Sequence, residues 1–272
     1  MLLAKHRTDS GERWSLEGHY LPFELTLSTL LELEREAMMR LLADCPKGDA
    51  ADGGLLAPID PAQEVWAAGV TYLRSRDARR VESTVANIYD HVYEAERPEL
   101  FFKAVGWRVV GHGMPIRIRS DSRWNVPEPE LVIVINRHGE IVGYCAGNDV
   151  SSRHIEGENP LYLPQAKVYN GSCALGYGIC LCSPEQLKDV PTKLKIQRAG
   201  EMLFEGETST ATMKRTLSEL AHYLTMELDF PQGVFLMTGT CLVPGNDFTL
   251  QPGDLVTIQV GALVIENDVA SG

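Results

Sequence analysis

The order of apolar and polar residues along the chain predicts a protein built mainly from short strands. In residues 1–24, apolar and polar positions alternate between turn residues, which is typical of half-buried β-strands. Short runs rich in β-branched residues recur through the rest of the chain. They predict strands at 64–72, 98–103, 109–118, 131–136, 141–146, 192–197, 202–205 and 234–240, and a closing pair of strands at 254–267.

Helical spacing of apolar residues is confined to three segments. Leucines recur at this spacing over 28–43, where Thr29 and Glu32 fit a capping box. The segment 74–93 carries many charges and only a thin apolar stripe, and a third helix is predicted at 216–225. With few helices and no regular βαβ alternation, the expected fold class is α+β, mainly β, with one large mixed-β domain.

A change in composition predicts two domains. Residues 47–55 are rich in glycine and aspartate and predict a loop or a linker. We therefore expect a small N-terminal domain, 1–58, followed by a larger domain, 59–272. The small domain shows no evident chemistry, so any functional site is expected in the larger one.

Residues 128–149 carry the most informative pattern in the chain. The apolar runs LVIVIN and IVGYCA are separated by RHGE, which has the length and the glycine of a hairpin loop. Folding the hairpin about this loop brings position 128 opposite position 149. Glu128 and Glu130 lie two apart on an extended chain, so both side chains point to the same face. The carboxylates of Glu128, Glu130 and Asp149 therefore converge at the open end of the hairpin.

Converging carboxylates predict a metal site. Like charges at short range repel strongly unless a cation lies among them or protons neutralise them. An all-oxygen set suits a hard divalent ion, Mg²⁺ first, with Mn²⁺ or Ca²⁺ next. In the alternative interpretation, Glu128 and Glu130 are solvated residues ahead of a strand, as the glutamates of an isolated ExE motif usually are. The matched Asp149 across the hairpin favours the metal.

The composition of the chain argues against some classes of binding partner. The formal net charge of −12 argues against binding nucleic acid or an anionic membrane through bulk electrostatics. The six cysteines show neither a CxxC pair nor zinc spacing, which favours reduced thiols in a cytoplasmic protein. A signal peptide and an apolar run of transmembrane length are both missing from the pattern, so a soluble protein is expected.

Two common catalytic motifs are excluded. The run GSCALGYG at 171–178 resembles a phosphate loop only loosely, because Tyr177 stands where the lysine is required. Neither a GxSxG elbow nor a strand–GxGxxG–helix unit occurs. The segment 151–167 shows no strong period, and long irregular segments in compact domains tend to be functional.

Several motifs in order resemble the fumarylacetoacetate hydrolase superfamily. The resemblance runs from about Gly69 to the C-terminus and implies an FAH-type mixed β-roll, a homodimer, and a divalent metal on the same three carboxylates that the hairpin selects. The motifs are GVTY at 69–72, PELFFK at 98–103, ExE at 128–130, GYCAGND at 143–149, QAK at 165–167, LMTGT at 236–240 and LQPGDLVTIQVGALVIENDV at 250–269.

Within this superfamily the chain is most similar to the sugar-acid branch. The runs GVTYLRSR, YDHVYEAERPELFFKA and IEGENPLYLPQAK carry this likeness. The branch implies Mg²⁺-dependent dehydration of a 2-keto-3-deoxy sugar acid, such as 2-keto-3-deoxy-D-arabinonate, to 2,5-dioxopentanoate. A 2-keto acid can chelate the metal, which stabilises the enolate formed when C3 loses a proton, and a C4 hydroxyl can then leave.

The resemblance also implies residues that contact the substrate. Lys167 lies in the QAK segment, where the superfamily places a lysine that reaches the metal-bound substrate. We expect Lys167 to be catalytic, with Gln165 as a hydrogen-bonding neighbour. Thr240, in the LMTGT motif, is expected to bind the substrate.

The charged segment and the strand after it supply the remaining candidates. The segment 74–96 is predicted to be a lid, in which Arg74 and Arg76 meet the substrate carboxylate. Glu99 follows it on the strand 98–103 and is predicted to be the acid/base residue, with its pKa tuned by burial beside the metal. Glu99 and Lys103 are four apart, a spacing that a plain surface ion contact would also produce.

One position separates dehydration from the alternative, hydrolysis of a C–C bond in an acylpyruvate or other 2,4-diketo acid. Many hydrolases of this superfamily carry a histidine three residues after the strand tyrosine, paired with a glutamate, to activate water. Here that position is Ser75, which cannot act alone as a general base, and His91 could replace the histidine only if the lid folds back. Dehydration needs no activated water, because Glu99 can carry protons between C3 and the departing hydroxyl.

A third hypothesis is a metal-stabilised dimer that only binds keto acids. The presence of Glu99, Lys167 and Thr240 disfavours it, because an inactive relative has no need for these groups. The preferred prediction is a dehydratase, that is, a metal-dependent hydro-lyase.

Overall fold

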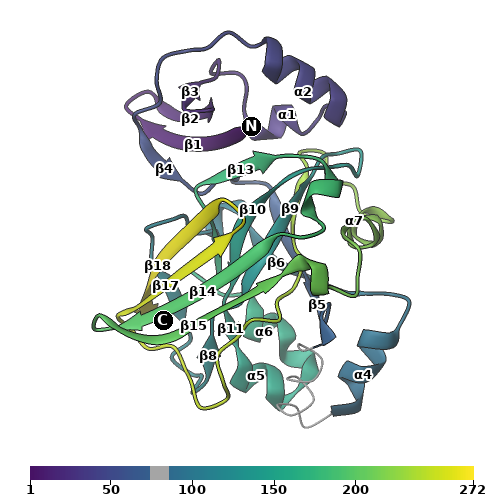
Figure 1. Cartoon of the computed structure of the whole chain (residues 1–272), viewed down its shortest axis with the longest axis vertical. Coiled ribbons are helices and arrows are strands. Elements are labelled where there is room, and N and C mark those ends of the chain that lie inside the picture. The colour runs from purple at the N-terminus through teal and green to yellow at the C-terminus, as the bar shows by residue number, and fades with distance from the viewer. Residues whose placement is uncertain (74–85) are drawn as a thin grey trace.

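The computed structural model describes residues 1–73 and 86–272. Within these ranges the chain is mainly β, which confirms the predicted fold class, and its strands form three sheets (Figure 1). The largest sheet contains, in spatial order, β3 (His19–Tyr20), β2 (Gly11–Leu16), β1 (Leu2–Thr8), β13 (Gly178–Leu181), β10 (Ile141–Asp149), β9 (Pro129–Ile135), β16 (Val234–Met237), β5 (Glu64–Gly69) and β6 (Glu99–Val105). Two short strands join it from the side: β12 (Cys173–Leu175) pairs with β10, and β4 (Gly54–Leu56) pairs with β1.

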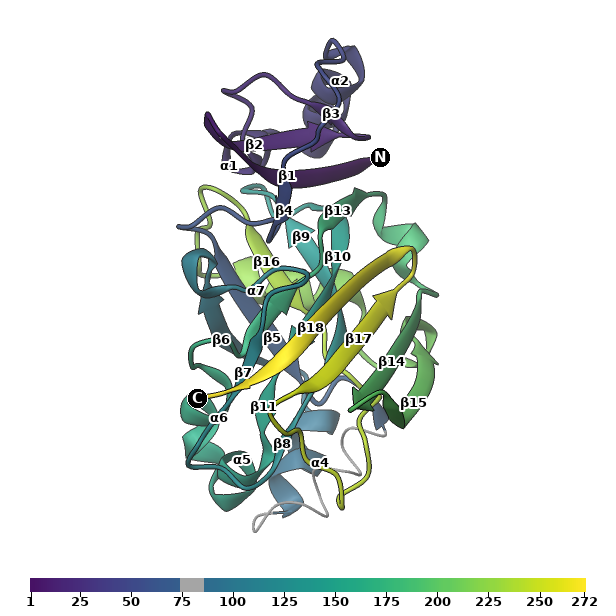
Figure 2. The same ribbon diagram turned by 90° about the vertical axis from the view of Figure 1, so that its left-hand side faces the viewer.

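A second sheet packs across the middle of the first. Its strands β14 (Pro191–Arg198), β17 (Asp254–Val260) and β18 (Leu263–Ser271) lie over β9 and β10, as Figure 2 shows from the side. Every residue of β9 and β10 is buried, which agrees with their continuous apolar runs. The second sheet contains β15 (Glu201–Ser209), β14 (Pro191–Arg198), β17 (Asp254–Val260), β18 (Leu263–Ser271) and β7 (Ile116–Ile118), and a small third sheet pairs β11 (Ser151–Ser152) with β8 (Asn125–Val126).

Short helices lie around the sheets. No described helix is both long and apolar enough to cross a membrane. The α-helices are α1 (Leu27–Leu30), α2 (Arg35–Asp44), α4 (Ala86–Glu94), α5 (Arg153–Glu158), α6 (Leu163–Lys167) and α7 (Leu217–Thr225). Short 3-10 turns are η1 (Gly106–Arg108), η2 (Pro160–Tyr162), η3 (Pro184–Leu187) and η4 (Thr210–Thr212).

The predicted hairpin has the predicted register. Pro129 pairs with Asn148, and the Asp149 N–H donates to the carbonyl of Glu128 at 3.0 Å, so positions 128 and 149 face each other. A bulge between Ile141 and Gly143, just after the loop, accommodates one extra residue in β10. The hairpins and helix expected in the C-terminal part are also present, including the turn at Ala199 and Gly200, both with positive φ.

The helix predicted over 28–43 is wrong as a single element. It is broken into α1 and α2, because the loop of the central hairpin binds the chain between them. The Arg137 N–H donates to the Leu31 carbonyl at 2.9 Å, and Asn136 Nδ2 donates to the Leu33 carbonyl at 2.9 Å. The capping box is also shifted, since Thr26 caps α1 and pairs with Thr29.

Three other element boundaries differ from the prediction. The strand over 64–72 ends at Gly69, because Val70 adopts a positive φ of 54° that leaves the sheet. Only Ile116–Ile118 of the segment 109–118 is a strand. The segment 151–167 is not irregular, since it folds into β11, α5, η2 and α6.

The N-terminal segment shares the large sheet. β1 pairs antiparallel with β13, with Leu3 opposite Ile179. A buried Lys5 also joins the segment to the rest of the chain, since its ammonium lies 3.3 Å from Asp60 and donates to the Ile59 carbonyl at 2.9 Å. The division at residue 58 stays a prediction.

Asn136 organises the hairpin loop, and its replacement by alanine should destabilise the fold. Its Oδ1 accepts from the N–H groups of His138 and Glu140, and its Nδ2 donates to the Leu33 carbonyl and to Glu140 Oε2. The side chain is buried, so Asn136→Ala leaves partners unsatisfied and should cost roughly 3 kcal/mol of unfolding free energy. Urea unfolding measures this loss.

The matched control is Arg137→Ala, one residue on. The Arg137 side chain is exposed, and the hydrogen bond of this residue to Leu31 comes from its backbone. Its replacement should change the unfolding free energy by less than about 0.5 kcal/mol. Equal effects of the two substitutions would contradict the role given to Asn136.

Candidate active site and metal centre

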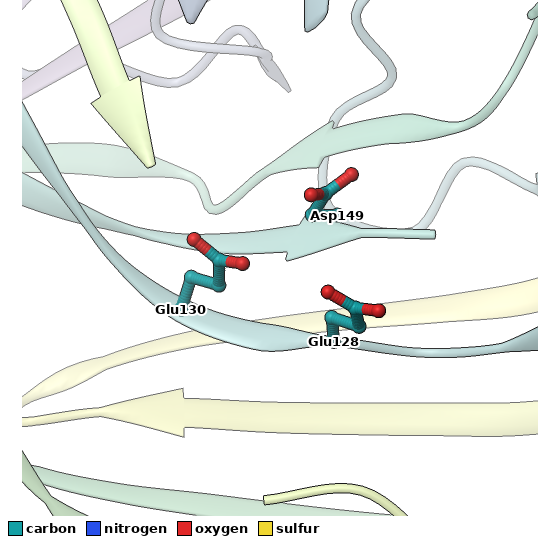
Figure 3. A group of neighbouring side chains, drawn as sticks. All are labelled: Glu128, Glu130 and Asp149. Atoms are coloured by element: carbon teal, nitrogen blue, oxygen red, sulfur yellow. The ribbon is translucent and has the colours of Figure 1, made fainter. Parts of the chain in front are cut away.

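Three carboxylates meet at the open end of the β9–β10 hairpin. Glu128 precedes β9, Glu130 lies in it, and Asp149 ends β10. One ligand atom from each side chain lies within 4.8 Å of the others, and all three side chains are buried. Figure 3 shows Glu128 and Glu130 on one stretch of chain, pointing toward Asp149 on the neighbouring strand. The spacing of the residues and the register of the hairpin therefore produce the predicted cluster.

Basic side chains surround this cluster. Lys167 Nζ lies 2.9 Å from Glu128 Oε2 and 2.8 Å from Asp149 Oδ2. On the other oxygen of Asp149, Lys103 Nζ makes a contact of 2.5 Å. Arg153 Nη2 lies 3.1 Å from Glu128 Oε1. The cluster is therefore held by ion pairs that come from β6, α5 and α6.

The charged form of Glu130 is disfavoured in this arrangement. Burial, followed by the nearby carboxylates of Asp149 and Glu128, raises its pKa well above the usual range. Lys167 and a hydrogen bond from the Gly239 N–H, at 2.6 Å, act in the opposite direction. A hard divalent cation among these oxygens would remove the repulsion, so the donor set fits such an ion.

The parallel pair β5 and β16 brings two more loops to the cluster. These strands run side by side, so their carboxyl ends open at the same edge of the sheet. There the Thr71 hydroxyl donates to the Thr238 carbonyl at 2.7 Å. A Cβ on Gly239 would lie 2.0 Å from the Thr71 hydroxyl, so only glycine lets these loops meet and aim the Gly239 N–H at Glu130.

Val70 is strained beside this contact. Its φ of 54° is unfavourable for a β-branched residue, and Val70 lines the cavity in front of the carboxylates. The Lys214 N–H donates to the Thr71 carbonyl at 2.9 Å, and Tyr72 bridges to Met213. These bonds hold the strained backbone in place.

Alternate residues of β6 face the site. Glu99 and Phe101 line the cavity, and Lys103 lies deeper, against Asp149. The Glu99 carboxyl lies directly over Gly69 on the neighbouring strand, where any Cβ would be 2.0 Å from Glu99 Oε2. Gly69 therefore makes room for the predicted acid/base residue.

The structure brings together most, but not all, of the predicted site residues. Lys167 and Thr240 line the same cavity as Glu99 and the three carboxylates. Gln165 is exposed and is not among the described residues that line this cavity, and its carbonyl accepts from Arg119 Nη1 at 3.1 Å. Arg74 and Arg76 lie outside the described residues, and so does most of the proposed lid.

Sequence reasoning missed three residues of the site. Lys103 is not a surface residue, since its side chain is fully buried and its ammonium contacts Asp149. Its position, four residues after Glu99 on one strand, would have placed it on the same face. Arg153 and Glu156 also line the cavity, and their separation of three residues is the helical signal that could have found them in α5.

Known proteins match this fold and sequence. The family model described as Fumarylacetoacetate (FAA) hydrolase C-terminal matches residues 64–270. A probable 2-keto-3-deoxyxylonate dehydratase from Haloferax volcanii is 45% identical over 255 residues, which cover 90% of this chain and 87% of that protein. A 2-dehydro-3-deoxy-D-arabinonate dehydratase from Saccharolobus solfataricus is 45% identical over 211 residues, 75% of this chain and 70% of that protein.

A solved structure also matches the fold of this chain. It is a 2-keto-3-deoxy-D-arabinonate dehydratase complexed with magnesium and 2,5-dioxopentanoate. The match has a TM-score of 0.85 and 34% sequence identity, and it covers 100% of this chain and 99% of that chain. The likeness therefore extends over the N-terminal segment as well as the sheets around the site.

Replacing Glu130 by glutamine should have two opposite effects. Without metal, Glu130→Gln removes a costly buried charge while the amide oxygen can still accept from Gly239, so the melting temperature should rise. The increase in melting temperature that Mg²⁺ or Mn²⁺ gives the wild type should be lost. Thermal unfolding with and without the metal measures both effects.

Glu201→Gln is the control for this experiment. It removes the same charge from an exposed position on β15. This variant should keep the metal-dependent increase in melting temperature. If Glu130→Gln also keeps it, Glu130 is not a ligand.

Proposed function

The chain belongs to the fumarylacetoacetate hydrolase family, and we propose that it is a metal-dependent dehydratase of a 2-keto-3-deoxy sugar acid. The observation that carries the proposal is the 45% identity, over 90% of the chain, to a probable 2-keto-3-deoxyxylonate dehydratase. The reaction removes water from a 2-keto-3-deoxy pentonate and gives 2,5-dioxopentanoate. The enzyme is thus a carbon–oxygen hydro-lyase.

Mg²⁺ is the proposed cofactor, and Glu128, Glu130 and Asp149 are its proposed ligands. Magnesium is present in the solved dehydratase structure, and the three buried carboxylates offer the oxygen ligands that this ion prefers. When bound, the ion would polarise the C2 carbonyl of a 2-keto acid and make the C3 protons more acidic.

Lys167 is proposed to bind the anionic oxygens of the substrate. Its ammonium is buried among the carboxylates, which keeps a positive charge at the wall of the cavity. Lys103 and Arg153 hold Asp149 and Glu128 from the sides. Because these three side chains are fixed by ion pairs, the charges are in place before the substrate arrives.

Glu99 is proposed to take the proton from C3. It extends from β6 over Gly69 into the cavity that the three carboxylates and Lys167 also line. Carboxylates are common general bases, and a proton next to a polarised carbonyl is within their range. The C4–O bond breaks after the C3 proton has been removed.

Hydrolysis of a C–C bond is less well supported. It requires a base that activates water, and no histidine occurs among the described residues that line the cavity. His91 lies on α4 and is exposed, and Ser75 lies outside the described residues. The dehydratase is therefore the preferred function.

A homodimer in the cytoplasm completes the proposal. The family resemblance supports the dimer. The six cysteines are free thiols, as expected in a reducing compartment.

Product analysis tests the reaction. The purified enzyme with Mg²⁺ is incubated with 2-keto-3-deoxy pentonates, 2-keto-3-deoxy hexonates and acylpyruvates, and the products are identified by NMR. We expect 2,5-dioxopentanoate from a pentonate and no pyruvate from the acylpyruvates. Efficient release of pyruvate, with no dehydration of any sugar acid, would contradict the proposal.

Glu99→Gln should be inactive while it still binds the metal. The amide keeps the size of the side chain but cannot take a proton, so turnover should fall by about a hundredfold or more. Activity assays and the metal-dependent change in melting temperature are measured side by side. Turnover close to wild type would remove Glu99 from the proton-transfer step.

A further inference from the structure

Besides Glu99 and the three clustered carboxylates, one more carboxyl group lines the cavity among the described residues, that of Glu156. We propose that Glu156 is a second acid/base residue of the dehydratase, which donates a proton to the departing C4 hydroxyl and then removes a proton from C5. This assignment rests on the proposed function. It explains how a dehydration can end in a 2,5-dioxo acid.

Glu156 has the location that this role requires. It lines the same cavity as Glu99, Lys167 and the three clustered carboxylates, and its side chain is only 5% exposed. It is not one of those three carboxylates, because the described cluster consists of Glu128, Glu130 and Asp149. Burial of a carboxyl group at the wall of a polar cavity is costly, and such groups are often functional.

The surroundings of α5 fix this side chain relative to the metal centre. The Ser151 hydroxyl donates to Glu156 Oε2 at 3.2 Å. One turn before Glu156, Arg153 binds Glu128 through both Nε and Nη2, each at 3.1 Å. The Ser152 hydroxyl caps the helix by accepting from the Ile155 N–H. A short helix thus supports one metal-site carboxylate and presents another acid to the cavity.

The chemistry of the product requires more than one proton transfer. Loss of a C3 proton and of the C4 hydroxyl leaves a C3=C4 double bond, with C5 still an alcohol carbon. To become an aldehyde, C5 must lose a proton while C3 gains one, which moves the double bond to C4=C5. The resulting enol then loses its hydroxyl proton and gains a proton at C4. The second transfer acts on two carbons, C5 and C3, that are two bonds apart.

Two carboxyl groups can carry out the proton transfers at C3, at the C4 hydroxyl and at C5 without any other reactant. Glu99, ionised, takes the C3 proton, while Glu156, protonated, gives its proton to the C4 hydroxyl, which leaves as water. Glu156 is then ionised and takes a proton from C5, and Glu99 returns its proton to C3. Both residues end in their starting forms. Their delivery from different elements, β6 and α5, suits action at different carbons of one substrate.

Glu156→Gln separates this role from the role of Glu99. In D₂O the variant should still exchange the C3 protons of a 2-keto-3-deoxy pentonate, because Glu99 is intact. Formation of 2,5-dioxopentanoate should fall by about a hundredfold or more, because the amide neither donates to the C4 hydroxyl nor takes the C5 proton. Glu99→Gln should lose both reactions. NMR follows exchange and product in the same sample.

Two controls keep the result interpretable. Glu158→Gln removes a charge from an exposed position on the same helix and should behave as wild type in both reactions. An unchanged metal-dependent increase in melting temperature shows that Glu156→Gln folds and keeps its metal centre.

The outcomes distinguish the assignment from the function on which it rests. Near-normal formation of the dioxo acid by Glu156→Gln would overturn the assignment, and so would equal loss of C3 exchange and product in a folded, metal-binding variant. If the wild type forms no dioxo acid from any pentonate, the proposed function fails and the assignment falls with it.

Discussion

The burial of three carboxylates at one point is the constraint on which the rest of the site depends. Such a cluster is unstable in a low-dielectric interior unless positive charge surrounds it. Lys103, Lys167 and Arg153 supply part of that charge. The pKa of Glu130 nevertheless stays raised, first by burial and then by the charges of Asp149 and Glu128. A divalent cation bound here would therefore do more than catalyse, because it would also balance the charge of the centre.

The fold meets this constraint by bringing distant segments to one end of the central sheet. β9 and β10 supply the carboxylates, β6 supplies a lysine, and α5 and α6 supply an arginine and a second lysine. The parallel strands β5 and β16 add a backbone donor, the Gly239 N–H. Close packing of these segments explains why glycine is required at Gly239, where a Cβ would overlap Thr71, and why Gly69 leaves room for the Glu99 carboxyl group.

The sequence predicted the parts of this arrangement that depend on local spacing. A hairpin with a short loop has a nearly fixed register, so Asp149 could be paired with Glu128 in advance. Spacing places Lys103 on the same face of the strand as Glu99, but it does not tell whether that face meets solvent or an acidic cluster. The break between α1 and α2 was also hidden, since it arises from hydrogen bonds to Asn136 and Arg137, about a hundred residues away. Tertiary contacts thus overrode a regular leucine spacing.

The carboxylate cluster and the other two carboxyl groups of the cavity come from separate elements. The carboxylate cluster lies on two fully buried central strands, where any change would disturb the core. The two carboxyl groups proposed to act on the substrate carbons come from β6, at the edge of the sheet, and from the six-residue helix α5. In this proposal, activation of a 2-keto acid depends on the central strands, while the reactions at C4 and C5 depend on residues at their periphery. Such a separation allows one framework to direct a common activated substrate to different products, because Glu99 and Glu156 lie outside the hairpin that carries the three carboxylates.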